Sequence, residues 1–246
     1  NGSDPYGLYH TVQVYRTRDF TSWENLGQAL PLSARPGGTE FRPHVLYDAS
    51  SRRFVMWFED RGTGLGSGYA VATASTPAGP FTTLSCCDLQ PPGSGRIGDF
   101  DLFVDDDGAA YHIRTGFDIV RLSPDLSNFS AHVSSFSAAG EGPVSFKRGG
   151  VYYVLVGSGC CACVGGSSIE VYTAPSMRGP WSHRGEIGRT AQPFDKHSPS
   201  NFVTRAQASK VIPVPAAGGG THYLWMGNQW NSGLASSPPG PRRHDL

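Results

Sequence analysis

The sequence has no excess of charge of either sign, because its twenty basic and twenty acidic residues cancel. A basic stripe, the electrostatic footprint of a nucleic-acid-binding protein, is missing. No run of like charges marks a solvated tail or a segment that lies on a membrane surface. We therefore expect neither a nucleic acid nor a membrane as a partner.

Long apolar runs are also missing. No stretch approaches the roughly 20 apolar residues that a membrane-spanning helix requires. The opening Asn1-Gly2-Ser3-Asp4-Pro5 contains no apolar signal core. We expect a secreted or extracellular protein whose signal peptide is not part of this sequence.

Cysteine is scarce, with five residues in two clusters, Cys86-Cys87 and Cys160-Cys161-Ala162-Cys163. The clusters lack the paired C-x-x-C spacing of zinc sites, and no histidine stands near them in the sequence. This favours a structural disulfide or buried thiols over a metal site and leaves the pairing open.

The chain shows no helical period and no linker that would divide it, so residues 1–246 are expected to form a single domain. Glycine (32 residues) and proline (19 residues) are abundant, and aromatic residues make up 11% of the chain. This composition suits an all-β fold of short strands joined by many turns.

A short phrase recurs along the chain, each time after a strand-like run. It begins with Ser, Thr or Asp and ends in an aromatic residue, and the closing aromatics are Trp23, Phe81, Phe129 and Trp181. These aromatics stand about 50 residues apart, which is typical of the blades of a β-propeller. One blade cannot cover its own apolar faces and has to stack on its neighbours.

Turn-forming clusters and β-branched runs between these phrases indicate four antiparallel strands per blade. The pattern predicts a five-bladed β-propeller. Its first blade is incomplete, because only its two outer strands are present. The predicted blades cover residues 9–30, 40–85, 98–135, 140–190 and 200–240.

Four blocks, in order, resemble a known family. They are Phe41–Asp48 (FRPHVLYD), Asp99–Gly108 (DFDLFVDDDG), Glu141–Lys147 (EGPVSFK) and Gly179–Trp181 (GPW). Their order and spacing are similar to those of the exo-β-1,3-galactanase branch of glycoside hydrolase family 43. The resemblance implies a five-bladed, exo-acting, inverting glycosidase. Relative to that family, the propeller of this chain looks truncated at both ends. We expect a monomer whose partner is an oligo- or polysaccharide, β-1,3-galactan or arabinogalactan.

The resemblance implies that Glu141 is the general acid. Glu141 stands at a strand start among small residues, which leave room for a substrate. Asp99 occupies the place of the carboxylate that tunes the pKa of the acid and holds its orientation. Asp101 is a rival two residues further on, on the same face of the strand.

Gln207 matches the glutamine that the galactanase branch has in place of a catalytic base. An amide has negligible basicity, so Gln207 is expected to position water or to act as an imidic acid in a proton chain. For an inverting enzyme we expect roughly 6.5–9.5 Å between the acid and the water-activating group.

Four further residues are candidates for binding the substrate. The galactanase branch has a sugar-contacting glutamate directly before an Arg-Pro pair, but here Phe41 holds that position and the glutamate is Glu40. Either a local bulge brings Glu40 back to the site, or that contact is lost. Arg42 is expected to pair with a carboxylate of the site. Tyr69 and Trp230 could stack on a sugar or could simply fill the core.

Two alternatives stay open. Phe41 is compatible with a galactan-binding propeller that has lost turnover, and the fold also suits another family 43 glycosidase, such as an arabinofuranosidase or xylosidase.

We expect no cofactor and no catalytic metal. Asp105-Asp106-Asp107-Gly108 could hold a structural calcium ion, but the cluster lacks a bidentate glutamate and is more typical of a hairpin turn.

Overall fold

The computed structural model describes residues 11–61, 67–93, 97–159, 167–188 and 206–228. Within these ranges the chain is all-β, with sixteen strands and one short 3-10 helix, η1 (Leu32–Ala34). The described ranges contain no helix of the length and apolarity that crossing a bilayer takes.

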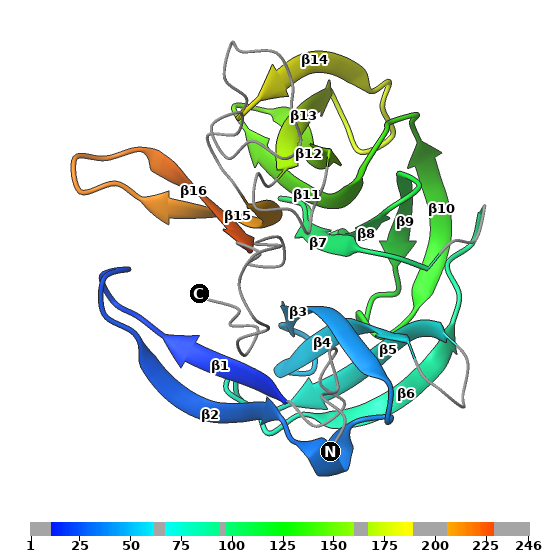
Figure 1. The fold of residues 1–246 in the computed structure, drawn as a ribbon, viewed down its shortest axis with the longest axis vertical. Helices are drawn as coiled ribbons and strands as arrows, with labels where there is room; N and C mark the ends of the chain where they lie inside the picture. The colour runs from blue at the N-terminus through cyan, green and yellow to red at the C-terminus, as the bar shows by residue number, and fades with distance from the viewer. Residues whose placement is uncertain (1–10, 62–66, 94–96, 160–166, 189–205, 229–246) are drawn as a thin grey trace, which may run out of the picture. The chain divides into compact units, whose positions relative to one another are not determined.

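The described strands form three four-stranded and two two-stranded antiparallel sheets (Figure 1). In each four-stranded sheet the strands lie side by side in chain order, as expected for successive hairpins. The two-stranded sheets are β1 (Val12–Arg16) with β2 (Glu24–Leu30), and β15 (Gln207–Pro215) with β16 (Thr221–Asn228). The four-stranded sheets are β3 (Thr39–Asp48), β4 (Arg53–Arg61), β5 (Ser67–Ala74) and β6 (Thr82–Leu89); β7 (Phe100–Val104), β8 (Ala110–Arg114), β9 (Asp118–Leu122) and β10 (Phe129–Ser135); and β11 (Glu141–Arg148), β12 (Val151–Gly159), β13 (Ser167–Ala174) and β14 (Ser182–Ile187).

The recurring phrase forms the connection before the last strand of its sheet. Its polar side chains bond to the local backbone, which is how Asp and Ser stabilise tight turns. In the first copy, Asp19 Oδ1 accepts the backbone N–H of Thr21 at 2.9 Å and that of Ser22 at 2.8 Å. In the third copy, Asp125 Oδ1 accepts the backbone N–H of Ser127 at 3.3 Å, and the Ser123 hydroxyl oxygen accepts the backbone N–H of Asn128 at 3.0 Å. The repeat therefore marks equivalent turns.

The expected all-β class and strand order are confirmed, and the number of blades and the closure of a ring remain predictions. The predicted blades at 40–85, 98–135 and 140–190 correspond to the three four-stranded sheets. The described part of the predicted blade at 200–240 contains β15 and β16.

The chain divides into two compact units. The first comprises residues 1–97 and 121–131, and the second comprises residues 98–120 and 132–246. In the first unit the hairpin tip at 121–131 packs on the β3–β6 sheet, where the indole N–H of Trp57 donates to the carbonyl of Leu126 at 2.7 Å. The buried core of this unit is Ala29, Leu30, Met56, Phe58, Ala70, Ala72, Ala74 and Phe81.

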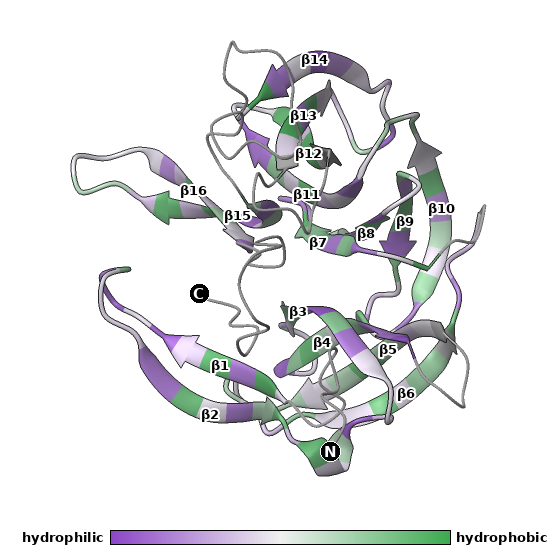
Figure 2. Cartoon of the chain, viewed as in Figure 1, coloured by the Kyte–Doolittle hydropathy of each residue, from purple (hydrophilic) through white to green (hydrophobic). Residues whose placement is uncertain are grey.

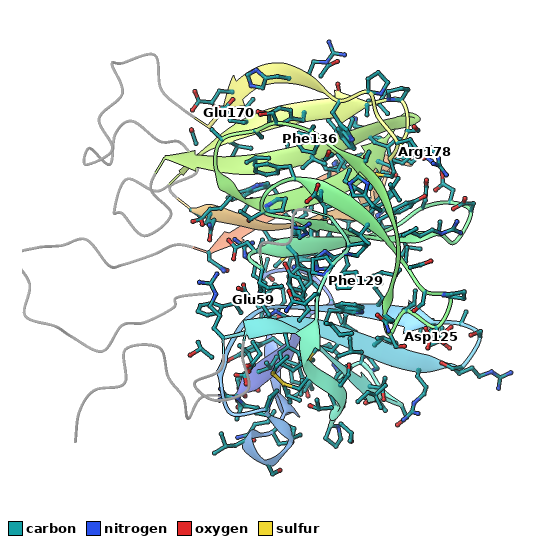
Figure 3. All side chains as sticks on the ribbon, turned by 90° about the vertical axis from the view of Figure 1, so that its right-hand side faces the viewer. Glu59, Asp125, Phe129, Phe136, Glu170 and Arg178 are labelled. Atoms are coloured by element: carbon teal, nitrogen blue, oxygen red, sulfur yellow. A yellow bond between two sulfur atoms is a disulfide. The ribbon has the colours of Figure 1, made fainter. Side chains whose placement is uncertain are left out.

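The described residues of the second unit include two apolar clusters, one on either face of the β11–β14 sheet. Hydrophilic and hydrophobic residues are interleaved along most strands, so each sheet can bury apolar side chains and still carry polar ones (Figure 2). Phe136, labelled in Figure 3, extends one cluster by packing on Tyr172 and Trp181, with ring centroids 4.9 and 5.2 Å away. The other cluster, Val144, Leu155, Ile169, Ala208 and Val211, joins the β11–β14 and β15–β16 sheets.

Candidate active site

Three edge strands of the second unit each carry a polar residue at their start. Strands β7, β11 and β15 are edge strands of three separate sheets, and β11 contacts both β7 and β15. Asp99 directly precedes β7, Glu141 opens β11 and Gln207 opens β15. Three sheets therefore each supply one functional side chain from the same end of an edge strand.

The Gln207 amide bridges the two carboxylates. Its Nε2 lies 3.2 Å from Glu141 Oε1 and 3.4 Å from Asp99 Oδ2. Gln207 is buried, with 4% of its surface exposed, whereas Asp99 and Glu141 are half-buried. The NH2 group of Gln207 thus donates to one oxygen of each carboxyl group. The predicted acid, its acidic companion and the carboxamide thus form one cluster.

Glycine before Glu141 is a steric requirement. Gly140 has φ +126°, and a Cβ there would stand 2.1 Å from the carbonyl oxygen of Gly157 on β12. Only glycine allows the chain to approach β12 this closely at this backbone angle. The small residue predicted to leave room for a substrate therefore also sets the start of β11.

A β-bulge follows Glu141. Glu141 pairs with Gly157 and the next pair is Val144 with Leu155, so Gly142-Pro143 forms the extra length on β11. A bulge of this kind bends a strand and changes the direction of a side chain next to it. The sequence Glu-Gly-Pro therefore contains both the predicted acid and the bulge that sets the direction of its side chain.

The start of β15 is equally constrained. Gln207 pairs with Asn228 on β16, and a second bulge follows between Ala208 and Lys210. A Cβ on Gly227 would meet the Gln207 carbonyl oxygen at 2.8 Å. The backbone of the carboxamide residue is thus closely packed by its partner strand.

The expected gap between the acid and the water-activating group is not present, because Gln207 donates directly to Glu141 at 3.2 Å. The amide of Gln207 contacts both carboxyl groups directly. Gln207 is therefore closer to Glu141 than it would be if a water molecule lay between them.

Asp101, the rival of Asp99, is engaged elsewhere. It is fully buried and accepts hydrogen bonds from Ser145 and Lys210. Asp99 is thus the carboxylate that contacts Gln207.

In the first unit, a bulge follows Phe41 in the same way as the bulge after Glu141. Phe41 pairs with Glu59, and the next pair is His44 with Trp57, which leaves Arg42-Pro43 as the extra length on β3. Phe41 thus occupies in β3 the place that an acid occupies in β11. The bulge lies after Phe41, so it does not bring Glu40 round to that face.

Glu40 instead belongs to a buried cluster in the first unit. It pairs across the sheet with Asp60 and forms an ion pair with Arg35, and the side chains of Glu40 and Arg35 are 3% and 1% exposed. A buried, ion-paired carboxylate is a poor sugar ligand. The structure therefore corrects the alternative in which Glu40 returns to contact the substrate.

The other predicted binding residues have different outcomes. Tyr69 is fully buried and packs edge-on against Phe129, with ring centroids 6.0 Å apart, so neither of its faces is open to a sugar; its prediction as a stacking residue is wrong. Arg42 is a half-buried residue of the bulge, with φ 53°. Trp230 lies outside the described residues.

Two buried acids on β4 were missed by the sequence reasoning. Glu59 and Asp60 are each 1% exposed, and Glu59 pairs with Arg61 at 2.6 Å. Burial, and then the charge of Glu40, raises the pKa of Asp60 to about 6. The available signal was two adjacent acids at the end of the apolar run Phe54–Phe58, where one of them must face inward.

The cysteine cluster of the first unit forms a disulfide between the neighbours Cys86 and Cys87. They lie in an irregular stretch of β6, between the pairs Val71–Ser85 and Tyr69–Leu89, and Cys87 has φ 70°. Asp60 Oδ1 is 3.3 Å from Cys87 Sγ. Cys160, Cys161 and Cys163 lie outside the described residues.

The Asp105–Gly108 cluster forms the turn between β7 and β8, as expected. Lys147 Nζ lies 2.8 Å from Asp105 Oδ1 and 2.7 Å from Asp106 Oδ2. Burial alone would raise the pKa of Asp105, but hydrogen bonds from Lys147 and Tyr152 outweigh it and lower the pKa. An ammonium group thus supplies the positive charge beside these carboxylates.

Known proteins share this fold. An exo-β-1,3-galactanase from Clostridium thermocellum superposes with a TM-score of 0.76 at 26% identity, covering 94% of this chain and 51% of that one. An exo-β-1,3-galactanase from Phanerochaete chrysosporium, solved with β-1,3-galactotriose, shares the fold with a TM-score of 0.70 at 24% identity, covering 90% and 51%. The chain thus spans about half the length of these structures.

A curated relative has a different activity. The arabinoxylan arabinofuranohydrolase of Bacillus subtilis (strain 168) is 25% identical over 72% of this chain and 42% of that protein. The family model of the glycosyl hydrolases of family 43 matches residues 3–216. The chain therefore belongs to glycosyl hydrolase family 43.

Proposed function

We propose that this chain is an exo-acting, inverting glycosidase that removes galactose from β-1,3-galactan or the galactan chains of arabinogalactan. The observation that carries the proposal is the amide of Gln207 held between Glu141 and Asp99. The similarity to the Clostridium thermocellum galactanase over 94% of this chain supports the choice of substrate.

In this proposal Glu141 donates a proton to the oxygen of the leaving sugar. A general acid must reach that oxygen and still be held in one orientation. Glu141 is half-buried, and its carboxylate is fixed from one side by Gln207. Asp99 acts through the same amide and keeps Gln207, and thereby Glu141, in place.

Gln207 holds the attacking water, but a neutral amide is too weak a base to keep its proton. The water therefore loses its proton to solvent as it attacks, and Glu141 regains from solvent the proton that it gave to the leaving sugar. The NH2 group of Gln207 faces the carboxylates, which leaves its carbonyl oxygen to accept a hydrogen bond from water. Inversion requires the acid and the water to stand on opposite faces of the sugar ring. The substrate therefore has to replace the direct contact between Gln207 and Glu141 with contacts to itself and to the water.

The substrate class also suggests where the protein works. Galactan is a polymer outside the cell, so we propose that the protein is secreted and acts there.

Hydrolysis of β-1,3-galactan by Glu141→Gln tests the assignment. We expect turnover to fall by about 10²–10⁴-fold, the usual contribution of a general acid. The matched control is Glu170→Gln, the same chemical change on β13 of the same sheet, where Glu170 pairs with the exposed His183 at 2.7 Å. If Glu141→Gln hydrolyses β-1,3-galactan at the wild-type rate, Glu141 is not the general acid.

The arabinofuranohydrolase relative supports a second candidate, a glycosidase that removes arabinose. Incubation with arabinoxylan beside β-1,3-galactan separates the two, since only the second candidate predicts arabinose as the main product. A third candidate, binding without turnover, is motivated by Phe41 in the place of an acid. It predicts that galactan oligosaccharides bind but that neither substrate yields a free sugar.

A further inference from the structure

Behind the three candidate site residues, the same three strands are joined by a second set of polar groups. Asp101 lies two residues after Asp99 on β7, and its Oδ2 accepts the backbone N–H of Ser145 at 2.6 Å and the Ser145 hydroxyl at 2.7 Å. Its Oδ1 accepts from Lys210 Nζ on β15 at 2.6 Å. One carboxylate thus contacts both neighbouring strands.

These contacts matter because β7, β11 and β15 belong to different sheets. No backbone ladder joins strands of different sheets, so their relative positions depend on side-chain contacts. The N–H of Ser145 turns toward Asp101. Lys210 Nζ also donates to the carbonyl of Leu102 at 2.6 Å, which adds a contact between β15 and the backbone of β7.

Asp101 and Ser145 lie in the interior of the protein, and Lys210 reaches them from a partly exposed position. Asp101 is fully buried and Ser145 is 3% exposed, while the Lys210 side chain is 31% exposed. Hydrogen bonds to a buried charge are stronger and more directional than those between neutral groups. Apolar packing also joins β11 and β15, but it does not fix a direction in the way that three converging donors do.

We propose that Asp101 is a positioning residue for the candidate active site and that Ser145 and Lys210 act with it. By fixing β7 against β11 and β15, it sets the distances among Asp99, Glu141 and Gln207. This inference rests on the proposed function for its kinetic readout but not for its structural one.

The variant Asp101→Asn tests the proposal. Asparagine has the same shape but replaces one acceptor oxygen by an NH2 group, which must then face at least one of the three donors around it. Small displacements of reacting groups cost about 10²-fold in rate. We expect kcat on β-1,3-galactan to fall by about 10–100-fold with little change in KM, and the pH profile of kcat to shift.

The matched control is Asp105→Asn. Asp105 also accepts from a lysine of β11, Lys147, at 2.8 Å, and so links the same two sheets beyond the far end of β7. This variant should lose an ion pair of the same kind and still keep its kcat and pH profile.

A second readout does not need activity. The side-chain amide signals of Gln207 in 15N NMR, identified by their loss in Gln207→Ala, report the contact with both carboxylates. We expect these signals to shift in Asp101→Asn and not in Asp105→Asn. If Asp101→Asn does not fold, Ser145→Ala, which removes only the hydroxyl donor, gives a smaller shift of the same signals.

The outcomes separate the two proposals. If the wild-type chain hydrolyses neither polysaccharide, the proposed function fails, while the Gln207 signals still decide the role of Asp101. Gln207 signals that stay unchanged in Asp101→Asn overturn the positioning role, as does a thermal stability that falls as in Asp105→Asn without any change in kcat or pH profile.

Discussion

At the scale of single residues, Gln207 is the central group of the candidate site. A neutral amide separates Glu141 from Asp99 and donates to both. A carboxylate in its place would bring three like charges together.

The variant Gln207→Glu should therefore make stability depend on pH. Like charges raise carboxyl pKa values in the folded state, so the folded protein binds protons more tightly than the unfolded one. We expect its Tm to fall below that of the wild type by an amount that grows from pH 5 to pH 8. An equal difference in Tm at both pH values would show that the carboxylates are too far apart to interact.

Asp60 makes a related prediction in the first unit. Its pKa is raised to about 6 by burial and by the charge of Glu40, above the value of roughly 4 in an unfolded chain. Because the folded state holds this proton more tightly, the wild type should lose stability as pH rises through this window.

The variant Asp60→Asn lacks that ionisation. Thermal unfolding at pH 4.5 and pH 8 should show that Asp60→Asn gains in Tm relative to the wild type at the higher pH. Comparing the two pH values cancels any cost of the substitution that does not depend on pH. A difference in Tm that is the same at both would mean that Asp60 ionises as freely in the folded protein as in the unfolded chain.

At the scale of strands, a proline-containing bulge recurs in two sheets. It follows Phe41 at Arg42-Pro43 and Glu141 at Gly142-Pro143. In both cases the residue directly before the bulge pairs regularly with the neighbouring strand. The same kind of bulge thus occurs twice, and the residue before it is acidic at Glu141 but aromatic at Phe41.

Gly140→Ala should disrupt the start of β11, because the new Cβ would overlap the Gly157 carbonyl. Gly185→Ala is the matched control: Gly185 also has a positive φ (+104°), but a Cβ there meets nothing within 4 Å. The backbone strain shared by both costs about 1 kcal/mol. Denaturant unfolding should show a larger loss for Gly140→Ala by at least about 1 kcal/mol, with lower activity; equal losses would contradict the steric role.

The strands and turns were predictable because they follow local rules. Alternating apolar residues between Gly, Asp and Ser clusters define a strand and its end, as at Asp105–Gly108. The position of the bulge after Phe41 was not predictable, since it depends on which residues of β4 pair with β3. Without that register the sequence could not tell that Glu40 faces Arg35.

The candidate site was predictable only in part and for a different reason. Asp99, Glu141 and Gln207 came from the resemblance, because no local pattern tells that they meet. Tyr69 was misjudged because burial depends on contacts distant in sequence, here with Phe129. Lys210 and Ser145 were missed because a lysine or serine in a strand is ordinarily solvent-facing.

At the scale of the whole molecule, all the residues of the candidate active site lie within one compact unit. Asp99, Glu141 and Gln207 all belong to the second unit, as do Asp101, Ser145 and Lys210. The galactanase structures from Clostridium thermocellum and Phanerochaete chrysosporium are about twice as long as this chain. Activity of the chain by itself is therefore the decisive property to measure.

The stereochemistry of the released galactose directly tests the proposal that the chain is an inverting galactanase. Proton NMR in the first minutes of digestion of β-1,3-galactan distinguishes the anomers of galactose before they equilibrate. The account predicts that α-galactose appears first, because water attacks the face opposite the β-linked leaving group. Release of β-galactose first, or of no galactose, would contradict it.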